Sequence, residues 1–120
     1  MARGPETLLV LRIVRAIRDE WPTAWVFKAH GNPYQSGGAP DLLVVVDGLL
    51  IGMEVKAQRR GESYARALRR VTLRQWAVIE DLRRAGATAG PVLSVDEALA
   101  LVRHALGEKI VSSADLTRPV

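Results

Sequence analysis

The chain has no cysteine, and none of its apolar runs is long. Without cysteine, disulfides and thiolate zinc sites are excluded, so a metal ion would need carboxylates, carbonyls, water or the two histidines. No apolar run approaches the roughly 20 residues that cross a bilayer, and the first residues lack a signal peptide's apolar core. We therefore expect a cytoplasmic protein with no membrane partner.

What is present fits one soluble domain. The 120 residues are 48% hydrophobic and 25% charged, which is an ordinary globular balance. A chain of this length has room for a single modest core. We predict one domain over residues 1–107, followed by a tail over residues 108–120 that has no clear period.

Apolar residues at helical spacing predict three helices. The second of them carries Leu73, Trp76, Ala77, Ile79 and Leu82 as its apolar stripe. The pairs Thr72/Gln75 and Ser94/Glu97 have the spacing of capping boxes, which mark helix starts. The expected helices are Glu6–Trp21, Thr72–Arg84 and Ser94–Leu106.

Short β-prone runs predict four strands, two of which are joined by Asp47-Gly48. This dipeptide is typical of a type I′ hairpin turn, so the two strands should pair antiparallel. A stretch rich in Gly, Asn, Pro and Ser from Gly31 to Pro40 is expected to be a loop. The order of elements predicts an α/β fold with a mixed β-sheet flanked by helices. The expected strands are Ala24–Ala29, Leu42–Val46, Leu49–Ala57 and Thr88–Leu93.

Three polar residues converge on this predicted hairpin. Alternation along the second strand puts Glu54 and Lys56 on one face, and Asp41 stands at the mouth of the paired strand. Two adjacent carboxylates repel each other unless a cation lies between them, and Mg²⁺ suits such a site. In the alternative interpretation, Asp41 caps a loop and the other two residues face solvent.

The net charge of +4 is concentrated in one segment. Between Lys56 and Arg74 seven basic residues face a single acid, Glu62, for a local charge of +6. This segment is interpreted either as a solvated helical face or as a surface that binds a polyanion. Tyr64 could stack on an unpaired base or pack against the following helix. The predicted DNA contacts are Arg59, Arg60, Arg66, Arg69, Arg70, Arg74 and Tyr64.

The segment Gly38–Lys56, GAPDLLVVVDGLLIGMEVK, resembles the PD-(D/E)-x-K nuclease motif. With Glu6 on the first helix and Thr72-Leu73-Arg74-Gln75 opening the next, the chain is similar to the VRR-NUC group over roughly residues 6–102. The resemblance implies a restriction endonuclease-like core. Standalone proteins of this group occur in phages and bacteria, so a bacterial or phage-infected cell is the expected setting.

The resemblance also implies roles for individual residues. Asp41, Glu54 and the Val55 carbonyl would bind Mg²⁺, which Mn²⁺ could replace, and Lys56 would be the catalytic lysine. Glu6 would bind the metal directly or through water, and Gln75 would contact metal-bound water or substrate. Each of these last two has an alternative: Glu6 as a first-turn acid favoured by the helix dipole, and Gln75 as part of the capping box.

The implied activity is structure-selective hydrolysis of DNA by a Holliday-junction-resolvase-like homodimer, with the last helix or the tail as the suggested interface. One alternative is a flap or nicking nuclease that works with a phage or bacterial helicase. Another is a non-catalytic nucleic-acid-binding module, against which the clustered carboxylates count. His30 and His104 are interpreted as surface and structural histidines, with a phosphate contact as the alternative for His30.

Overall fold

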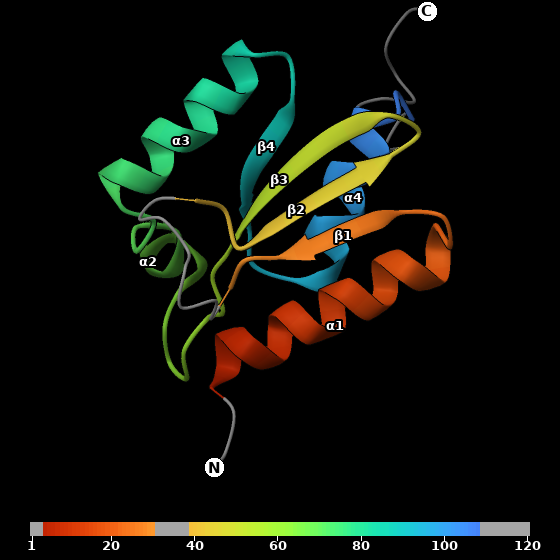
Figure 1. The fold of residues 1–120 in the computed structure, drawn as a ribbon. Coiled ribbons are helices and arrows are strands. Elements are labelled where there is room, and N and C mark those ends of the chain that lie inside the picture. The colour runs from red at the N-terminus through yellow and green to blue at the C-terminus, as the bar shows by residue number, and fades with distance from the viewer. Residues whose placement is uncertain (1–3, 31–38, 109–120) are drawn as a thin grey trace, which may run out of the picture.

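The computed structural model describes residues 4–30 and 39–108. Within them, a long first helix is followed by three strands, two further helices, a fourth strand and a last helix (Figure 1). None of the helices in these two ranges is long and apolar enough to cross a membrane. The elements are α1 (Pro5–Glu20), β1 (Trp25–Lys28), β2 (Leu42–Val46), β3 (Leu49–Val55), α2 (Tyr64–Leu68), α3 (Leu73–Arg84), β4 (Thr88–Val92) and α4 (Val95–Ala105).

The four strands form one mixed sheet in the order β1-β2-β3-β4. The first three strands are antiparallel, and β3 and β4 are parallel. Asp47 and Gly48 have φ values of 50° and 78°, so both lie in the left-handed region that a type I′ turn requires. The predicted hairpin and the predicted mixed sheet flanked by helices are thus confirmed. Residues 31–38 of the predicted loop Gly31–Pro40 lie outside the described residues.

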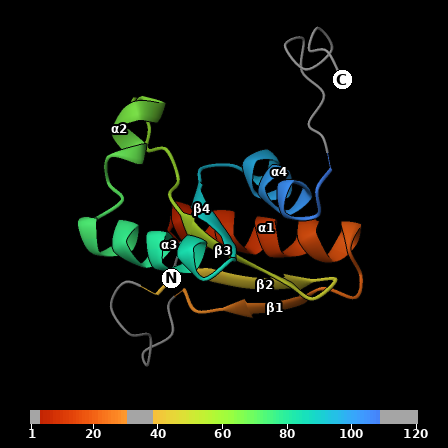
Figure 2. The same cartoon turned by 90° about the horizontal axis from the view of Figure 1, so that it is seen from above.

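One face of the sheet is covered by α1 and α4, which lie next to each other (Figure 2). Alternate residues of β2 and β3 point toward these helices and are buried, among them Leu42, Ile51 and Met53. Val10 and Val102 come from the two helices and have no exposed surface. Burial of this apolar face is the main stabilising contribution to the fold.

The opposite face is covered in part by α3, through a smaller cluster centred on Ile79. Gly52 of β3 permits a close approach there, because a Cβ at this position would lie 2.9 Å from Leu82 Cδ1. The β1 end of this face is more open. Trp25 and Phe27 are 55% and 42% exposed, and their rings stack with centroids 5.9 Å apart. The site described below lies on this same face, where β2 begins and β3 ends.

The structure differs from the sequence predictions at three places. The short helix α2 was not predicted, although Ser63 caps it by accepting a hydrogen bond from the Arg66 N–H. Leu73 was placed on the apolar stripe but is 89% exposed as the first residue of α3. Ser94 caps α4 as expected, but the Glu97 carboxylate accepts from the Leu93 N–H, one residue before the cap.

Candidate active site

Asp41 and Glu54 stand opposite each other on neighbouring strands. The register pairs Leu42 with Met53, and continuing it by one residue brings Asp41 opposite Glu54. Both residues are buried, with 8% and 3% of their surfaces exposed. The predicted convergence of these two carboxylates at the end of the hairpin is therefore what the structure shows.

Glu54 is flanked by two further polar side chains. Lys56 Nζ lies 3.9 Å from Glu54 Oε1, and Gln75 Nε2 donates a 2.8 Å hydrogen bond to the same oxygen. Burial raises the pKa of Glu54 to about 8, assisted by the charge of Asp41 and a hydrogen bond with it, and opposed by Lys56. In the absence of a cation, Glu54 therefore holds a proton near neutral pH.

Asp41 is held by groups from two other parts of the chain, β3 and the residues after β1. Its Oδ2 accepts a 2.8 Å hydrogen bond from the Val55 N–H, and its Oδ1 lies 3.0 Å from His30 Nδ1. His30 Nε2 lies in turn 3.1 Å from the Thr7 hydroxyl on α1. The interpretation of His30 as a surface residue was wrong, since it belongs to this site. Its place directly after the strand that pairs with β2 was the one indication in the sequence.

Arg70 is half-buried and joins three parts of the chain. Its Nε and Nη2 each lie 3.0 Å from the Glu62 carboxylate, and Nη1 lies 2.9 Å from Glu6 Oε1. Nη2 also donates to the carbonyl of Ala57, two residues after β3. These contacts fix the loop after β3 to the start of α1. Arg70 was predicted to bind DNA, but in the structure its guanidinium forms hydrogen bonds with Glu62, Glu6 and the Ala57 carbonyl.

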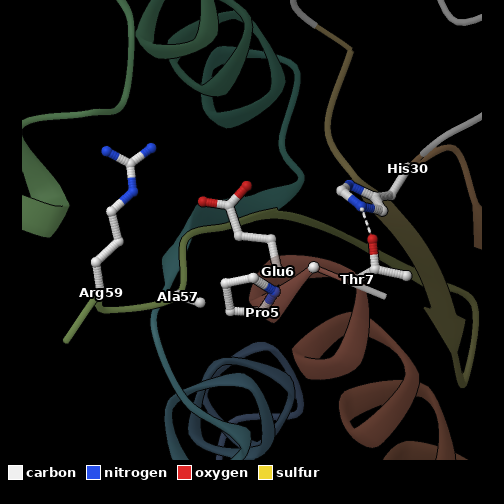
Figure 3. Close-up of a pocket in the computed structure, with 7 residues that line it drawn as sticks. Pro5, Glu6, Thr7, His30, Ala57 and Arg59 are labelled. Carbon is white, nitrogen blue, oxygen red and sulfur yellow. Dashed lines mark hydrogen bonds between the residues drawn. The ribbon is translucent and has the colours of Figure 1, made fainter. Parts of the chain in front are cut away.

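Glu6 lines a cavity of about 310 Å³ at the start of α1. Figure 3 shows its carboxylate between Arg59 and His30, which also line the cavity together with Thr7 and Ala57. Within the described residues, no three side chains of His, Cys, Asp or Glu gather closely enough to hold a metal ion. Direct metal binding by Glu6 therefore stays a prediction, as does the role of the Val55 carbonyl.

The other predicted DNA contacts lie beside the site on the loop after β3, on α2 and at the start of α3 (Figure 1). The side chains of Arg59, Arg60, Arg66, Arg69 and Arg74 are exposed. Tyr64 is 47% exposed, and a hydrogen bond with the Glu97 carboxylate of α4 raises its pKa. A basic, accessible surface thus borders the carboxylate pair.

The donor set suits a hard cation. Two buried carboxylates face each other with one amine nearby, and burial, together with the charge of Asp41, raises the pKa of Glu54, so a cation between the two carboxylates would be stabilising. A cation that keeps several waters, such as Mg²⁺, needs only one or two protein carboxylates. Asp41 and Glu54 are therefore the residues that would hold it, and water or substrate oxygens would complete its coordination.

No family model matches the sequence, and no curated protein matches it either. Among solved structures, one described as a VRR_NUC domain superimposes with a TM-score of 0.55. The two sequences are 24% identical, and the match covers 85% of this chain and 98% of the other. This chain therefore has the VRR_NUC domain fold, an α/β restriction endonuclease-like architecture, as the resemblance implied.

Proposed function

We propose that this protein is a metal-dependent nuclease that hydrolyses DNA phosphodiester bonds. The observation that carries the proposal is the pair of buried carboxylates, Asp41 and Glu54, facing each other beside the Lys56 amine. Two facing acids in a buried position point to a function, because their burial and mutual repulsion destabilise the fold. The shared fold with a VRR_NUC domain supports the same activity.

Each side chain has a task in this proposal. Asp41 and Glu54 would hold Mg²⁺ or Mn²⁺, which would supply Lewis acidity for the phosphodiester and would acidify a water molecule. Lys56 provides positive charge where negative charge develops and orients the attacking water. Gln75 holds Glu54 in place through its 2.8 Å hydrogen bond. The exposed arginines contact phosphates without selecting a sequence.

The finer proposal is a structure-selective enzyme that acts on branched DNA as a homodimer. One site of this kind cuts one strand, so paired cuts require a two-fold assembly. The apolar side chains of α4 pack inside the protomer, with Ala98 and Val102 fully buried. The last helix therefore offers less apolar surface for a dimer interface than its sequence suggested, and the tail beyond residue 108 lies outside the described residues.

The test is cleavage of labelled four-way junction, flap, single-stranded and linear duplex DNA with Mg²⁺ or Mn²⁺. We expect metal-dependent products from the wild type and none from Asp41→Ala or Lys56→Ala, while Asp81→Ala, which removes an exposed acid of α3, serves as the matched acid control. Symmetric nicks at the junction would support the resolvase proposal. Cleavage of flaps would instead support the alternative of a nuclease that works with a helicase. DNA binding without any metal-dependent product would overturn the nuclease proposal.

A further inference from the structure

His30 connects α1 to the carboxylate pair. Its Nδ1 lies 3.0 Å from Asp41 Oδ1, and its Nε2 lies 3.1 Å from Thr7 Oγ1. His30 follows β1 by two residues, Asp41 directly precedes β2, and Thr7 lies in the first turn of α1. A single imidazole ring thus spans the distance between a helix and the proposed metal ligand.

The chemistry of the two contacts determines which atom donates and which accepts in each hydrogen bond. An ionised carboxylate only accepts hydrogen bonds, so the contact requires a proton on His30 Nδ1, and this N–H donates a hydrogen bond to Asp41. In a neutral ring Nε2 is then an acceptor, and the Thr7 hydroxyl donates to it. The chain of donation runs from Thr7 through His30 to Asp41, and Thr7 favours the tautomer that Asp41 requires.

The effect is to hold both oxygens of Asp41. The terminal torsion of an aspartate is broad, so a carboxylate with one anchor can rotate. Here Oδ1 is held by His30 and Oδ2 by the Val55 N–H at 2.8 Å. Carboxylates and imidazoles that bind metals are commonly oriented by such outer hydrogen bonds. We propose that His30 is a positioning residue that fixes the Asp41 carboxylate in its metal-binding orientation, with Thr7 setting the tautomer.

The His30 side chain is not required to hold the strands together. The backbone N–H groups of Ala29 and His30 both donate to the Asp41 carbonyl, at 2.9 and 3.1 Å, and these contacts do not depend on the imidazole. The ring is also partly exposed, at 22%, and lines the cavity at the start of α1 (Figure 3). Its side chain therefore contributes mainly through its two polar contacts.

The inference rests on the proposed function. Its test measures metal binding directly, without DNA cleavage. Calorimetric titration of Mn²⁺ into the protein without DNA would compare the wild type with four variants. His30→Ala removes the donor. His30→Asn keeps an N–H near the position of Nδ1, whereas His30→Gln moves it toward the position of Nε2. His104→Ala, on the exposed side of α4, is the matched histidine control.

We expect His30→Ala and His30→Gln to weaken Mn²⁺ binding by about 10- to 100-fold, the usual effect of losing an outer hydrogen bond. His30→Asn should recover most of the affinity, and His104→Ala should bind as the wild type. If His30→Ala does not fold, the difference between the Asn and Gln variants decides. Equal affinities for those two variants would overturn the inference while leaving the nuclease proposal standing. A wild type that binds no Mn²⁺ would overturn both.

Discussion

Gln75 Nε2 donates to Glu54 Oε1 at 2.8 Å, while Gln75 Oε1 accepts from the Thr72 N–H at 2.9 Å. The same side chain therefore closes the capping box of α3 and holds a carboxylate of the candidate active site. The two interpretations of Gln75 are compatible, because the two ends of its amide serve different partners. This arrangement ties the position of α3 to the geometry of the site.

Substitutions at the cap can separate stability from activity. Thr72→Ala should lower the free energy of unfolding by about 1 kcal/mol through loss of the cap, with little change in cleavage rate. Gln75→Ala should lower stability by a similar amount and also slow cleavage by about 10-fold or more, because Glu54 loses its donor. Urea unfolding and single-turnover cleavage measure the two effects. Equal cleavage rates for both variants would show that the contact with Glu54 has no catalytic consequence.

The stability of the metal-free protein should depend on Glu54. Its pKa is raised from 4.5 to about 8 in the folded state, so the folded protein retains a proton that the unfolded chain releases in this range. The contribution of Glu54 to the free energy of unfolding is fully present below pH 4.5. It is lost as the pH rises to 8, by at most about 1.4 kcal/mol per pH unit.

Urea unfolding in EDTA at pH 5, 6.5 and 8 measures this dependence. Glu54→Gln should flatten it and should be more stable than the wild type at pH 8. Identical pH profiles for the two proteins would contradict the protonation of Glu54.

Metal binding should release a proton. Because the cation favours the ionised form of Glu54, Mn²⁺ affinity should rise with pH up to about 8, with close to one proton released per ion at pH 6.5. Calorimetry in buffers of different ionisation enthalpy counts that proton. A count near zero at this pH would mean that Glu54 is already ionised in the metal-free protein.

Arg70 should act on stability through its internal partners. A hydrogen bond with Arg70 is the main reason that the pKa of Glu62 is lowered to about 2, so the pair stays ionised far into the acid range. Arg70→Lys should lower the urea midpoint, because an ammonium cannot replace the bidentate contact with Glu62 and the contact with Glu6. Exposed Arg66→Lys is the matched control, and an equal midpoint for the two variants would contradict this role.

The exposed arginines should act on DNA binding instead. If Arg66 and Arg69 each contact a phosphate, Arg66→Ala and Arg69→Ala should each reduce the slope of log Kd against log salt concentration by about 1. Fluorescence anisotropy with labelled duplex or junction DNA gives this slope. Arg103, paired with Glu20 between α4 and α1, is a control whose replacement by Ala should leave the slope unchanged. A wild-type slope in both test variants would remove α2 from the DNA-binding surface.

Much of the fold was predictable because it follows from neighbours in the chain. The Asp47-Gly48 turn and the alternation along β2 and β3 place Asp41 and Glu54 on adjacent strands. The capping box of Thr72 and Gln75 defines the start of α3, and Gly86, with a φ of 98°, follows its end. Each of these features depends on residues a few positions apart, so local conformational preferences suffice to define them.

The remaining features required the tertiary structure. Arg70 and Glu6 are 64 positions apart, and no local pattern distinguishes Arg70 from the exposed arginines beside it. The contact of His30 with Asp41 likewise arises only when β1 pairs with β2, and its contact with Thr7 only when the residues after β1 lie beside the start of α1.

The sequence by itself thus determined the strands, the turn and the facing carboxylates, through steric preferences and alternation. The packing of helices on the sheet decided which arginine is internal, which histidine orients Asp41 and how strongly Glu54 holds its proton, because burial and contact between distant segments exist only in the folded chain.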